Sequence, residues 1–248
     1  MYLSDKEARD LILDIGQKMA AGGFVTANDG NITVRVSDNA VWATPTGVNK
    51  GDMTHEMLIK VAIDSGKVLQ GTWNPTTELD MHLNVYRTDH EIVSTAHAHP
   101  INLSVLACAG IELDLPSTPA ASIIAGRVPV VPFCCSGTKA LAVSIIPYVK
   151  TFNLVNLANH GPISWGRSPK EAWFRLENAE ASAKLALKLL EIGRFRPMSM
   201  EQVKEIVSSH HIRISDEAMV RAYDKIDNQQ SAILFTQLLQ QAADTAAV

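Results

Sequence analysis

Two histidines one residue apart, His97 and His99, close an apolar segment that begins at Ile92. If this segment is a β-strand, both side chains point to the same face, because alternate residues of a strand share a face. Imidazoles placed in this way can hold one metal ion, such as zinc, copper, iron or nickel. A third histidine, His160, follows the apolar residues 154–158. Three ligands and one open position are typical of a catalytic zinc site.

Loops rich in hydroxyl, amide and glycine residues separate the segments around these histidines, at residues 28–31, 44–47 and 74–78. Such residues are common in turns, and Thr76 or Thr77 can cap the helix that follows. Taken together, the loops offer hydroxyls, backbone N–H groups and a helix N-terminus. These groups can bind a phosphate without much positive charge.

Glu78 is the carboxylate of most interest in these loops, and we expect it in the first turn of a helix, where negative charge is favourable. It is either a routine first-turn glutamate or, if burial raises its pKa, a general acid or base. His82 lies four residues further, on the same helical face. We interpret His82 as a core residue or a partner behind the site rather than a metal ligand.

The composition restricts the class of protein. The net charge of −4 gives no basic footprint for nucleic acid, so a phosphate site has to be local. The three cysteines, Cys108, Cys134 and Cys135, form no Cys-x-x-Cys pair and fit a reducing compartment. We find neither a signal peptide nor an apolar stretch approaching about 18 residues. We therefore expect a cytoplasmic protein with no membrane partner.

Apolar periodicity and turn residues predict an α/β domain in which helices and strands are interleaved. Capping boxes at Ser4–Glu7 and Ser168–Glu171 predict helices that end near Gly22 and Gly193. Further helices are expected over 77–87, 100–109 and 139–150, and in the tail over 200–208, 216–226 and 230–242. Strands are expected over 32–36, 40–44, 58–63, 67–69, 92–98, 128–132, 154–158 and 163–165, with 128–132 at a sheet edge because of its prolines.

Five motifs in order resemble the class II aldolase/adducin-type family, in particular its L-fuculose-1-phosphate aldolase branch. They are Gly30–Arg35, Thr44–Gly47, Thr76–Glu78 with His82, His97–His99 and Leu157–Gly161. The resemblance implies a three-layer α/β/α fold around a central, mostly antiparallel sheet. The catalytic domain would span residues 1–196, and residues 197–248 would be a helical C-terminal extension of it. It also implies a homotetramer with active sites at the subunit interfaces.

The resemblance further implies a role for each motif residue. His97, His99 and His160 would bind the metal, which is usually Zn²⁺ in this family, with Mn²⁺ or Co²⁺ as alternatives. Glu78 would be the catalytic acid/base. The phosphate of a sugar phosphate substrate would be held by Gly30, Asn31, Thr46, Gly47, Thr76 and Thr77.

The leading expectation is an aldolase that cleaves a ketose 1-phosphate to dihydroxyacetone phosphate and an aldehyde through an enediolate stabilised by the metal. One alternative is a decarboxylase of a 3-keto sugar-acid phosphate, which uses the same chemistry. A second is a non-catalytic, adducin-like interaction module. A structural zinc protein is disfavoured because no fourth Cys or His ligand is apparent. The family aldolase has a tyrosine near the position of Ile123, and isoleucine cannot transfer a proton.

Overall fold

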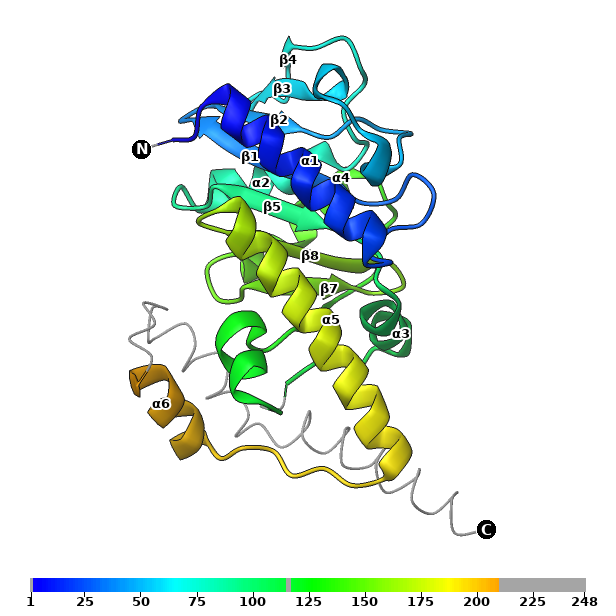
Figure 1. Cartoon of the computed structure of the whole chain (residues 1–248), viewed down its shortest axis with the longest axis vertical. Helices are drawn as coiled ribbons and strands as arrows, with labels where there is room; N and C mark the ends of the chain where they lie inside the picture. The colour runs from blue at the N-terminus through cyan, green and yellow to red at the C-terminus, as the bar shows by residue number, and fades with distance from the viewer. Residues whose placement is uncertain (1, 115–116, 210–248) are drawn as a thin grey trace.

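The computed structural model describes residues 2–114 and 117–209 and arranges them in three layers, with a sheet between two sets of helices (Figure 1). Within these residues, eight strands form one sheet in the order β4-β3-β2-β1-β5-β8-β7-β6, in which only β6 and β7 are parallel neighbours. The predicted α/β/α fold with a mostly antiparallel sheet is thus confirmed. The strands are β1 Asn31–Ser37, β2 Ala40–Ala43, β3 Ile59–Ala62, β4 Val68–Gln70, β5 Ser94–His97, β6 Val130–Val131, β7 Leu154–Leu157 and β8 Gly161–Gly166.

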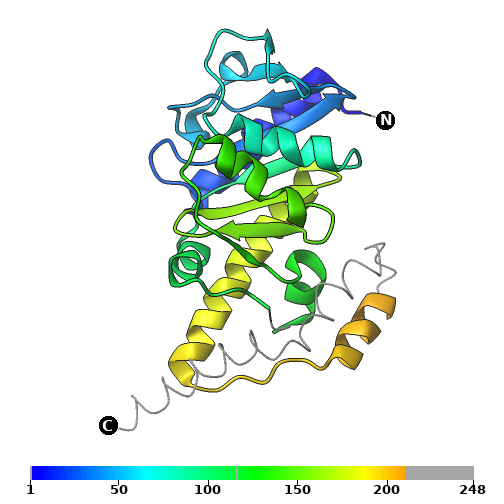
Figure 2. The same cartoon turned by 180° about the vertical axis from the view of Figure 1, so that it is seen from behind.

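Helices cover both faces of the sheet. α1 (Asp5–Ala21) and α5 (Pro169–Ile192) cross one face (Figure 1), and α2 (Leu79–Thr88) and α4 (Lys139–Ser144) cover the other (Figure 2). Each face has its own buried core, with Trp42 on the α1 side and Trp165 on the α2 side. The remaining helical segments are α3 Ile101–Ala109, α6 Met200–Ser209, the 3-10 turns η1 Lys50–Asp52, η2 His55–Met57 and η4 Ile146–Tyr148, and the π-helical turn η3 Ala121–Ala125.

The central strand β5 brings the first metal-ligand candidate into the middle of the sheet. It pairs with β1 and β8, so that His97 lies opposite Asn31 and Ile163. Side chains of a strand alternate between faces. On the α1 side, Ile32 and Ala96 join the apolar core. The residues that alternate with them along β1 and β5 are polar and buried, and they give the other face of these strands a polar strip of Asn31, Thr33, Thr95 and His97.

Most elements predicted from sequence are present, and the exceptions have local causes. The Ser4–Glu7 capping box forms, and α5 ends at Gly193. At the start of α5 the Ser168 side chain accepts the Glu171 N–H, whereas the Glu171 carboxylate accepts the Arg167 N–H. The helix predicted over 139–150 is present only as far as Ser144, because α4 ends ahead of Pro147, whose ring breaks an α-helix, and a 3-10 turn follows.

Glu78 is not in the first turn of a helix, because α2 starts one residue after it. The π-helical turn Ala121–Ala125 was not predicted. The predicted helices over 216–226 and 230–242 lie outside the described residues, and the division at residue 197 stays a prediction.

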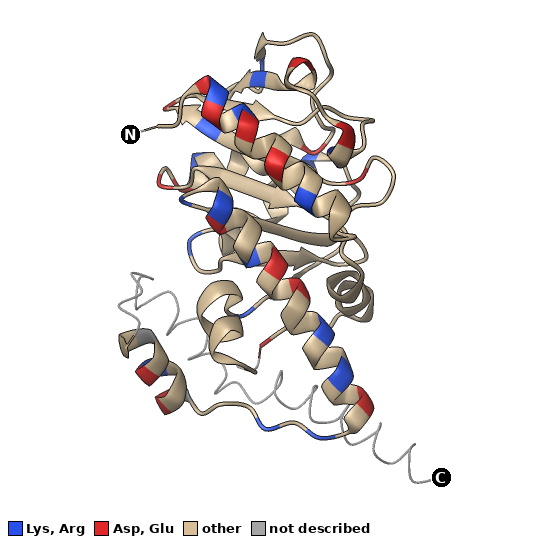
Figure 3. Ribbon diagram, in the orientation of Figure 1, with Lys and Arg blue, Asp and Glu red and all other residues tan. Residues whose placement is uncertain are grey.

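Charged residues occur along α1 and α5, whereas α3 has none (Figure 3). Ile101 and Val105 of α3 are exposed, although the helix starts two residues after His99. None of the helices in the described parts of the chain is long and apolar enough to cross a bilayer.

Glu180 of α5 fixes the start of α3. The helix begins after Pro100, whose side chain offers no cap to the first N–H groups. The Glu180 carboxylate accepts the backbone N–H of Asn102 at 3.0 Å and that of Leu103 at 2.9 Å, and also the Asn102 side-chain amide. A carboxylate at a helix N-terminus also interacts favourably with the helix dipole. These hydrogen bonds therefore anchor the start of α3, the helix that follows His99, to α5.

Replacing Glu180 by alanine should lower the free energy of unfolding by about 1–2 kcal/mol, since free N–H groups are left at the start of α3. Urea denaturation measures the change. Glu177→Ala is the matched control, because Glu177 lies on an exposed turn of the same helix. Equal stability of the two variants would contradict the capping role.

Candidate active site

Three histidines from distant parts of the sequence form one cluster at the end of the sheet. His97 ends β5, His99 follows two residues later, and His160 occupies the turn between β7 and β8. The three pairs of ring centroids are 4.8, 4.9 and 4.9 Å apart. One nitrogen of each ring lies within 4.8 Å of the others. The structure thus brings together the three residues predicted as metal ligands.

Neighbouring acceptor groups contact two of the rings. His97 Nδ1 lies 2.8 Å from the Pro162 carbonyl, which can only accept a hydrogen bond, so Nδ1 carries the proton and Nε2 carries a lone pair. His99 Nδ1 lies 3.3 Å from an Asp29 carboxylate oxygen, and its backbone N–H donates to the Phe24 carbonyl. Partners of this kind commonly fix the tautomer and orientation of ligating histidines.

The chemistry of this donor set fits a metal ion. Burial, together with the neighbouring histidines, holds the pKa of His97 well below its usual value, and burial also lowers the pKa of His160. These rings are therefore neutral at pH 7, as ligands must be. The Nε2 atoms of His97 and His99 are only 3.0 Å apart. At this distance the two Nε2 atoms either share a proton in a hydrogen bond or both face one bound cation.

Glu78 lies directly beside the cluster and is buried. Its Oε2 is 3.3 Å from His97 Nε2, and its Oε1 is 3.3 Å from His160 Nε2. Oε2 also accepts a hydrogen bond from the Asn31 amide at 3.0 Å. Oε1 and His160 Nδ1 are buried without a hydrogen-bond partner among the described residues. Asn31 thus holds the carboxylate through Oε2, and each of its two oxygens lies beside a histidine nitrogen.

A chain of buried hydrogen bonds runs from Glu78 into the core. The Asn31 amide donates to both Glu78 and Thr76, so the Asn31 carbonyl oxygen must accept from His82 Nε2. His82 Nδ1 then accepts from Thr95 at 2.5 Å. Complete burial lowers the pKa of His82 to about 4, against the opposing charge of Glu78, which agrees with this neutral form. The chain continues through Thr33 to Tyr86. As predicted, His82 is a partner behind the site.

The three loops predicted to bind phosphate contact one another. Pro45 pairs with Pro75, and the Thr46 N–H donates to the Asn74 carbonyl. Gly30 has a φ of 77° with almost no room for a side chain, because an added Cβ would lie 2.6 Å from Val25. The exposed candidates are Thr46, Gly47 and Thr77, whereas Gly30, Asn31 and Thr76 are buried. Their role in phosphate binding stays a prediction, and the Asn31 amide is engaged by protein groups.

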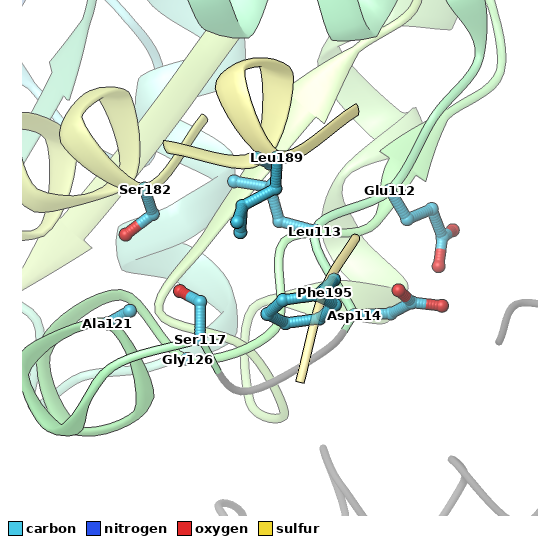
Figure 4. A pocket seen from close by; sticks show the side chains of 10 residues that line it. Glu112, Leu113, Asp114, Ser117, Ala121, Gly126, Ser182, Leu189 and Phe195 are labelled. Atoms are coloured by element: carbon cyan, nitrogen blue, oxygen red, sulfur yellow. The ribbon is translucent and has the colours of Figure 1, made fainter. Parts of the chain in front are cut away.

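One hollow lies beside Glu78, and another lies away from the histidine cluster. A polar one beside the start of α2 holds about 250 Å³ of empty space and is lined by Thr77, Glu78 and Lys139, among others. A larger one, about 430 Å³ and partly open to solvent, lies between η3 and the end of α5 (Figure 4). Its charged lining residues are Glu112 and Asp114, and it contains none of the predicted site residues. The first hollow gives access to Glu78, and the second is unsuited to a phosphate.

Two residues at the site carry no role in the sequence analysis. Asp29 contacts His99, and Lys50 is buried beneath the loops at 1% exposure. Asp29 belongs to a loop whose composition is that of an ordinary turn. Lysine is seldom buried, so nothing in the sequence marks Lys50 as an interior residue.

Comparison with known proteins gives consistent matches. The model of the family described as "Class II Aldolase and Adducin N-terminal domain" matches residues 10–187. A 3-oxo-tetronate 4-phosphate decarboxylase from Pectobacterium atrosepticum is 30% identical over 82% of this chain and 94% of its own. An L-fuculose phosphate aldolase from Methanococcus vannielii is 32% identical over 65% and 86%. The structure of a putative aldolase/epimerase/decarboxylase from Klebsiella pneumoniae superposes with a TM-score of 0.77 at 29% identity, covering 82% of this chain and 99% of that one.

The chain should bind one divalent ion at the histidine cluster. His99→Gln should weaken zinc binding by more than the roughly 10- to 100-fold seen when outer partners of metal ligands are lost. Titration of metal-free protein with zinc, followed by calorimetry, measures this. His55→Gln is the control, since His55 pairs with Asp10 on the surface. Tight binding retained in His99→Gln would refute the assignment.

Stability of the metal-free protein should fall as the pH drops from about 6.5 to 4. Below the ordinary histidine pKa near 6.5 the unfolded chain takes up protons, whereas His82 takes one up only near pH 4, so acid favours unfolding. Urea denaturation at pH 7.5 and 5 in chelator gives the slope. His82→Gln should show a shallower slope, and an identical slope would contradict the neutral, buried state of His82.

Proposed function

Because the chain belongs to the class II aldolase and adducin N-terminal domain family, we propose that it is a metal-dependent carboxy-lyase acting on a 3-oxo sugar-acid phosphate. The substrate would be of the 3-oxo-tetronate 4-phosphate type. The observation that carries the proposal is the Glu78 carboxylate held against His97 and His160. This choice reverses the order of the two activities expected from the sequence.

Two observations favour decarboxylation over aldol cleavage. The 3-oxo-tetronate 4-phosphate decarboxylase relative covers more of the chain, 82%, than the L-fuculose phosphate aldolase relative, which covers 65%. The second is Ile123, a residue of the partly buried π-helical turn that has no proton to exchange. Aldol cleavage has to remove a proton from the hydroxyl that becomes the aldehyde. Carbon dioxide leaves from a carboxylate that carries no such proton, so decarboxylation does not need the missing tyrosine.

His97, His99 and His160 would hold the metal, and the Lewis acidity of a bound divalent ion would polarise the substrate carbonyl. The bond between the carboxylate carbon and its neighbour breaks, and its electron pair passes to the neighbouring carbon and the carbonyl. The enediolate that remains is that of dihydroxyacetone phosphate. Glu78, which contacts the cluster through both oxygens, delivers the proton to carbon and regains it from water.

Aldol cleavage of a ketose 1-phosphate is the second candidate, supported by the 32% identity to the Methanococcus vannielii aldolase. It leaves the same enediolate, so the site residues would act alike and only the departing group would differ. A non-catalytic module is disfavoured, because such a module has no need for three converged imidazoles and a buried carboxylate.

Three further predictions belong to this proposal. Zinc would be the resident metal, with Mn²⁺ or Co²⁺ as substitutes. The protein would act in the cytoplasm. It would assemble as a homotetramer with active sites at subunit interfaces, and the uncharged α3 with its exposed Ile101 and Val105, beside His99, supports a contact at this edge.

Metal-loaded protein should release carbon dioxide and dihydroxyacetone phosphate from 3-oxo-tetronate 4-phosphate. Loss of proton delivery in Glu78→Gln should lower kcat by about 10²- to 10⁴-fold with the metal retained. Coupled assays for carbon dioxide and for aldehyde, run on a panel of 3-oxo-acid phosphates and ketose 1-phosphates, separate the two candidates. Glu177→Gln is the control. Aldehyde without carbon dioxide would replace the first candidate by the second.

A further inference from the structure

Lys50 is a buried cation whose hydrogen-bond partners are main-chain carbonyls. Its side chain is 1% exposed, and Nζ donates to the Asn28 carbonyl at 3.0 Å and to the Val48 carbonyl at 2.5 Å. These carbonyls belong to two different loops, residues 26–31 and residues 44–49. The ammonium group therefore joins the loop that contains Gly30 and Asn31 to the loop that contains Thr46 and Gly47.

The first helix keeps Lys50 in this position. Gly16 of α1 packs on the Lys50 backbone, and an added Cβ at Gly16 would lie 2.5 Å from the Lys50 carbonyl oxygen. Gly51 also lies close to α1, with its Cβ position 2.9 Å from Ala20. Asn49 caps the turn that starts at Lys50 by accepting the Gly51 N–H at 2.8 Å. The small residues on both sides let η1 approach α1 closely enough to bury the lysine.

If the side chain at position 50 served only to fill this space, an apolar residue would be more favourable there than a lysine. Burial of a charge is unfavourable unless the charge is compensated, and an apolar side chain of similar length avoids that loss. Burial lowers the pKa of Lys50 to about 8, with Asp29 opposing the shift, so the group keeps its proton at pH 7. Lys50 is also the single lysine or arginine in residues 26–31, 44–50 and 72–78. A protein of net charge −4 thus places one cation beneath these loops.

We propose that Lys50 is a positioning residue for the substrate phosphate, which ties the 26–31 and 44–49 loops into one anion-binding surface and supplies the positive charge beneath it. This inference rests on the proposed function for the identity of the phosphorylated substrate. It adds a residue that acts through the loops rather than at the histidines. The loop that Lys50 holds through the Asn28 carbonyl also contacts the metal cluster, because the next residue, Asp29, lies beside His99.

Two variants separate charge from hydrogen bonding. Lys50→Met removes both, whereas Lys50→Gln keeps an amide donor of similar length without charge. For the metal-loaded enzyme, both should raise KM for the phosphorylated substrate at least about tenfold, since a charge acting at short range in a partly buried site is worth that much. The kcat and the zinc content should stay near those of the unmodified protein. Lys67→Met, at an exposed lysine of the β3–β4 hairpin, is the control.

Inorganic phosphate tests the inference independently of turnover. Calorimetry should show phosphate binding to the unmodified zinc protein and to Lys67→Met, with affinity reduced at least about tenfold in both Lys50 variants. Equal phosphate affinity, or loss of zinc together with kcat at unchanged KM, would overturn the inference. Absence of turnover with any substrate, combined with phosphate binding that depends on Lys50, would overturn the proposed function alone.

If neither Lys50 variant folds, amide hydrogen exchange of the unmodified zinc protein tests the inference instead. In the unmodified zinc protein, phosphate should slow amide exchange in residues 26–31 and 44–49 together, because the lysine couples them. Protection of one loop alone, or of neither, would overturn the coupling. Ammonium sulfate at the same ionic strength and a neutral sugar are the reference additions, since sulfate should protect both loops and the sugar neither.

Discussion

The approach of three imidazole rings to one point is the constraint on which the rest of this site depends. His97 Nε2 and His99 Nε2 are 3.0 Å apart, the Nδ1 proton of His97 is directed toward the Pro162 carbonyl, and His99 Nδ1 lies 3.3 Å from the Asp29 carboxylate. Three imidazoles that each bring a nitrogen this close together can hold one cation. The main chain holds the arrangement, because His97 ends the central strand β5 and pairs across from Asn31 and Ile163.

The buried polar strip behind the cluster gives the two oxygens of Glu78 different environments. Oε2 accepts from Asn31, whose own carbonyl is held by the neutral His82, and the donors behind His82 all point the same way through Thr95 and Thr33. Within the described part of the chain, Oε1 has no hydrogen-bond partner. A buried carboxylate with one oxygen fixed by a hydrogen bond and the other beside His160 is suited to exchanging a proton at a defined position. The alternation of β1 and β5 makes this possible, since it separates the polar strip from the apolar core on the α1 side.

The metal cluster and the loops that would hold phosphate form one assembly. Thr76 links Asn31 to the loop before α2, Asp29 links the first loop to His99, and Lys50 links the first loop to the second. Hydrogen bonds within the protein would therefore fix the position of a substrate bound by its phosphate relative to the metal ion and Glu78. Decarboxylation and aldol cleavage place the same demand on this assembly, because both leave an enediolate that must be stabilised and protonated. The chemistry of the departing group distinguishes them.

Local sequence was sufficient for the elements with strong local signals. The serine caps at Ser4 and Ser168, the glycines after α1 and α5 and the alternation around His97 act over a few residues, and the structure contains the helices and strand that they predict. The helix expected over 139–150 failed where Pro147 outweighed the apolar pattern. Residue type and motif were enough to predict that the three histidines and Glu78 lie together, and the structure brings them together.

The tertiary structure alone decided which of these groups are neutral, oriented and joined. Burial of Lys50 against Gly16, the contact of Asp29 with His99 and the engagement of the Asn31 amide by Glu78 join residues far apart in the chain. The β5 alternation places His97 on a face, but the strands β1 and β8 on either side determine its neighbours. Hydrogen bonding and desolvation depend on the atoms within a few ångströms of a group, and for these residues such atoms come from segments that the order of amino acids does not place side by side.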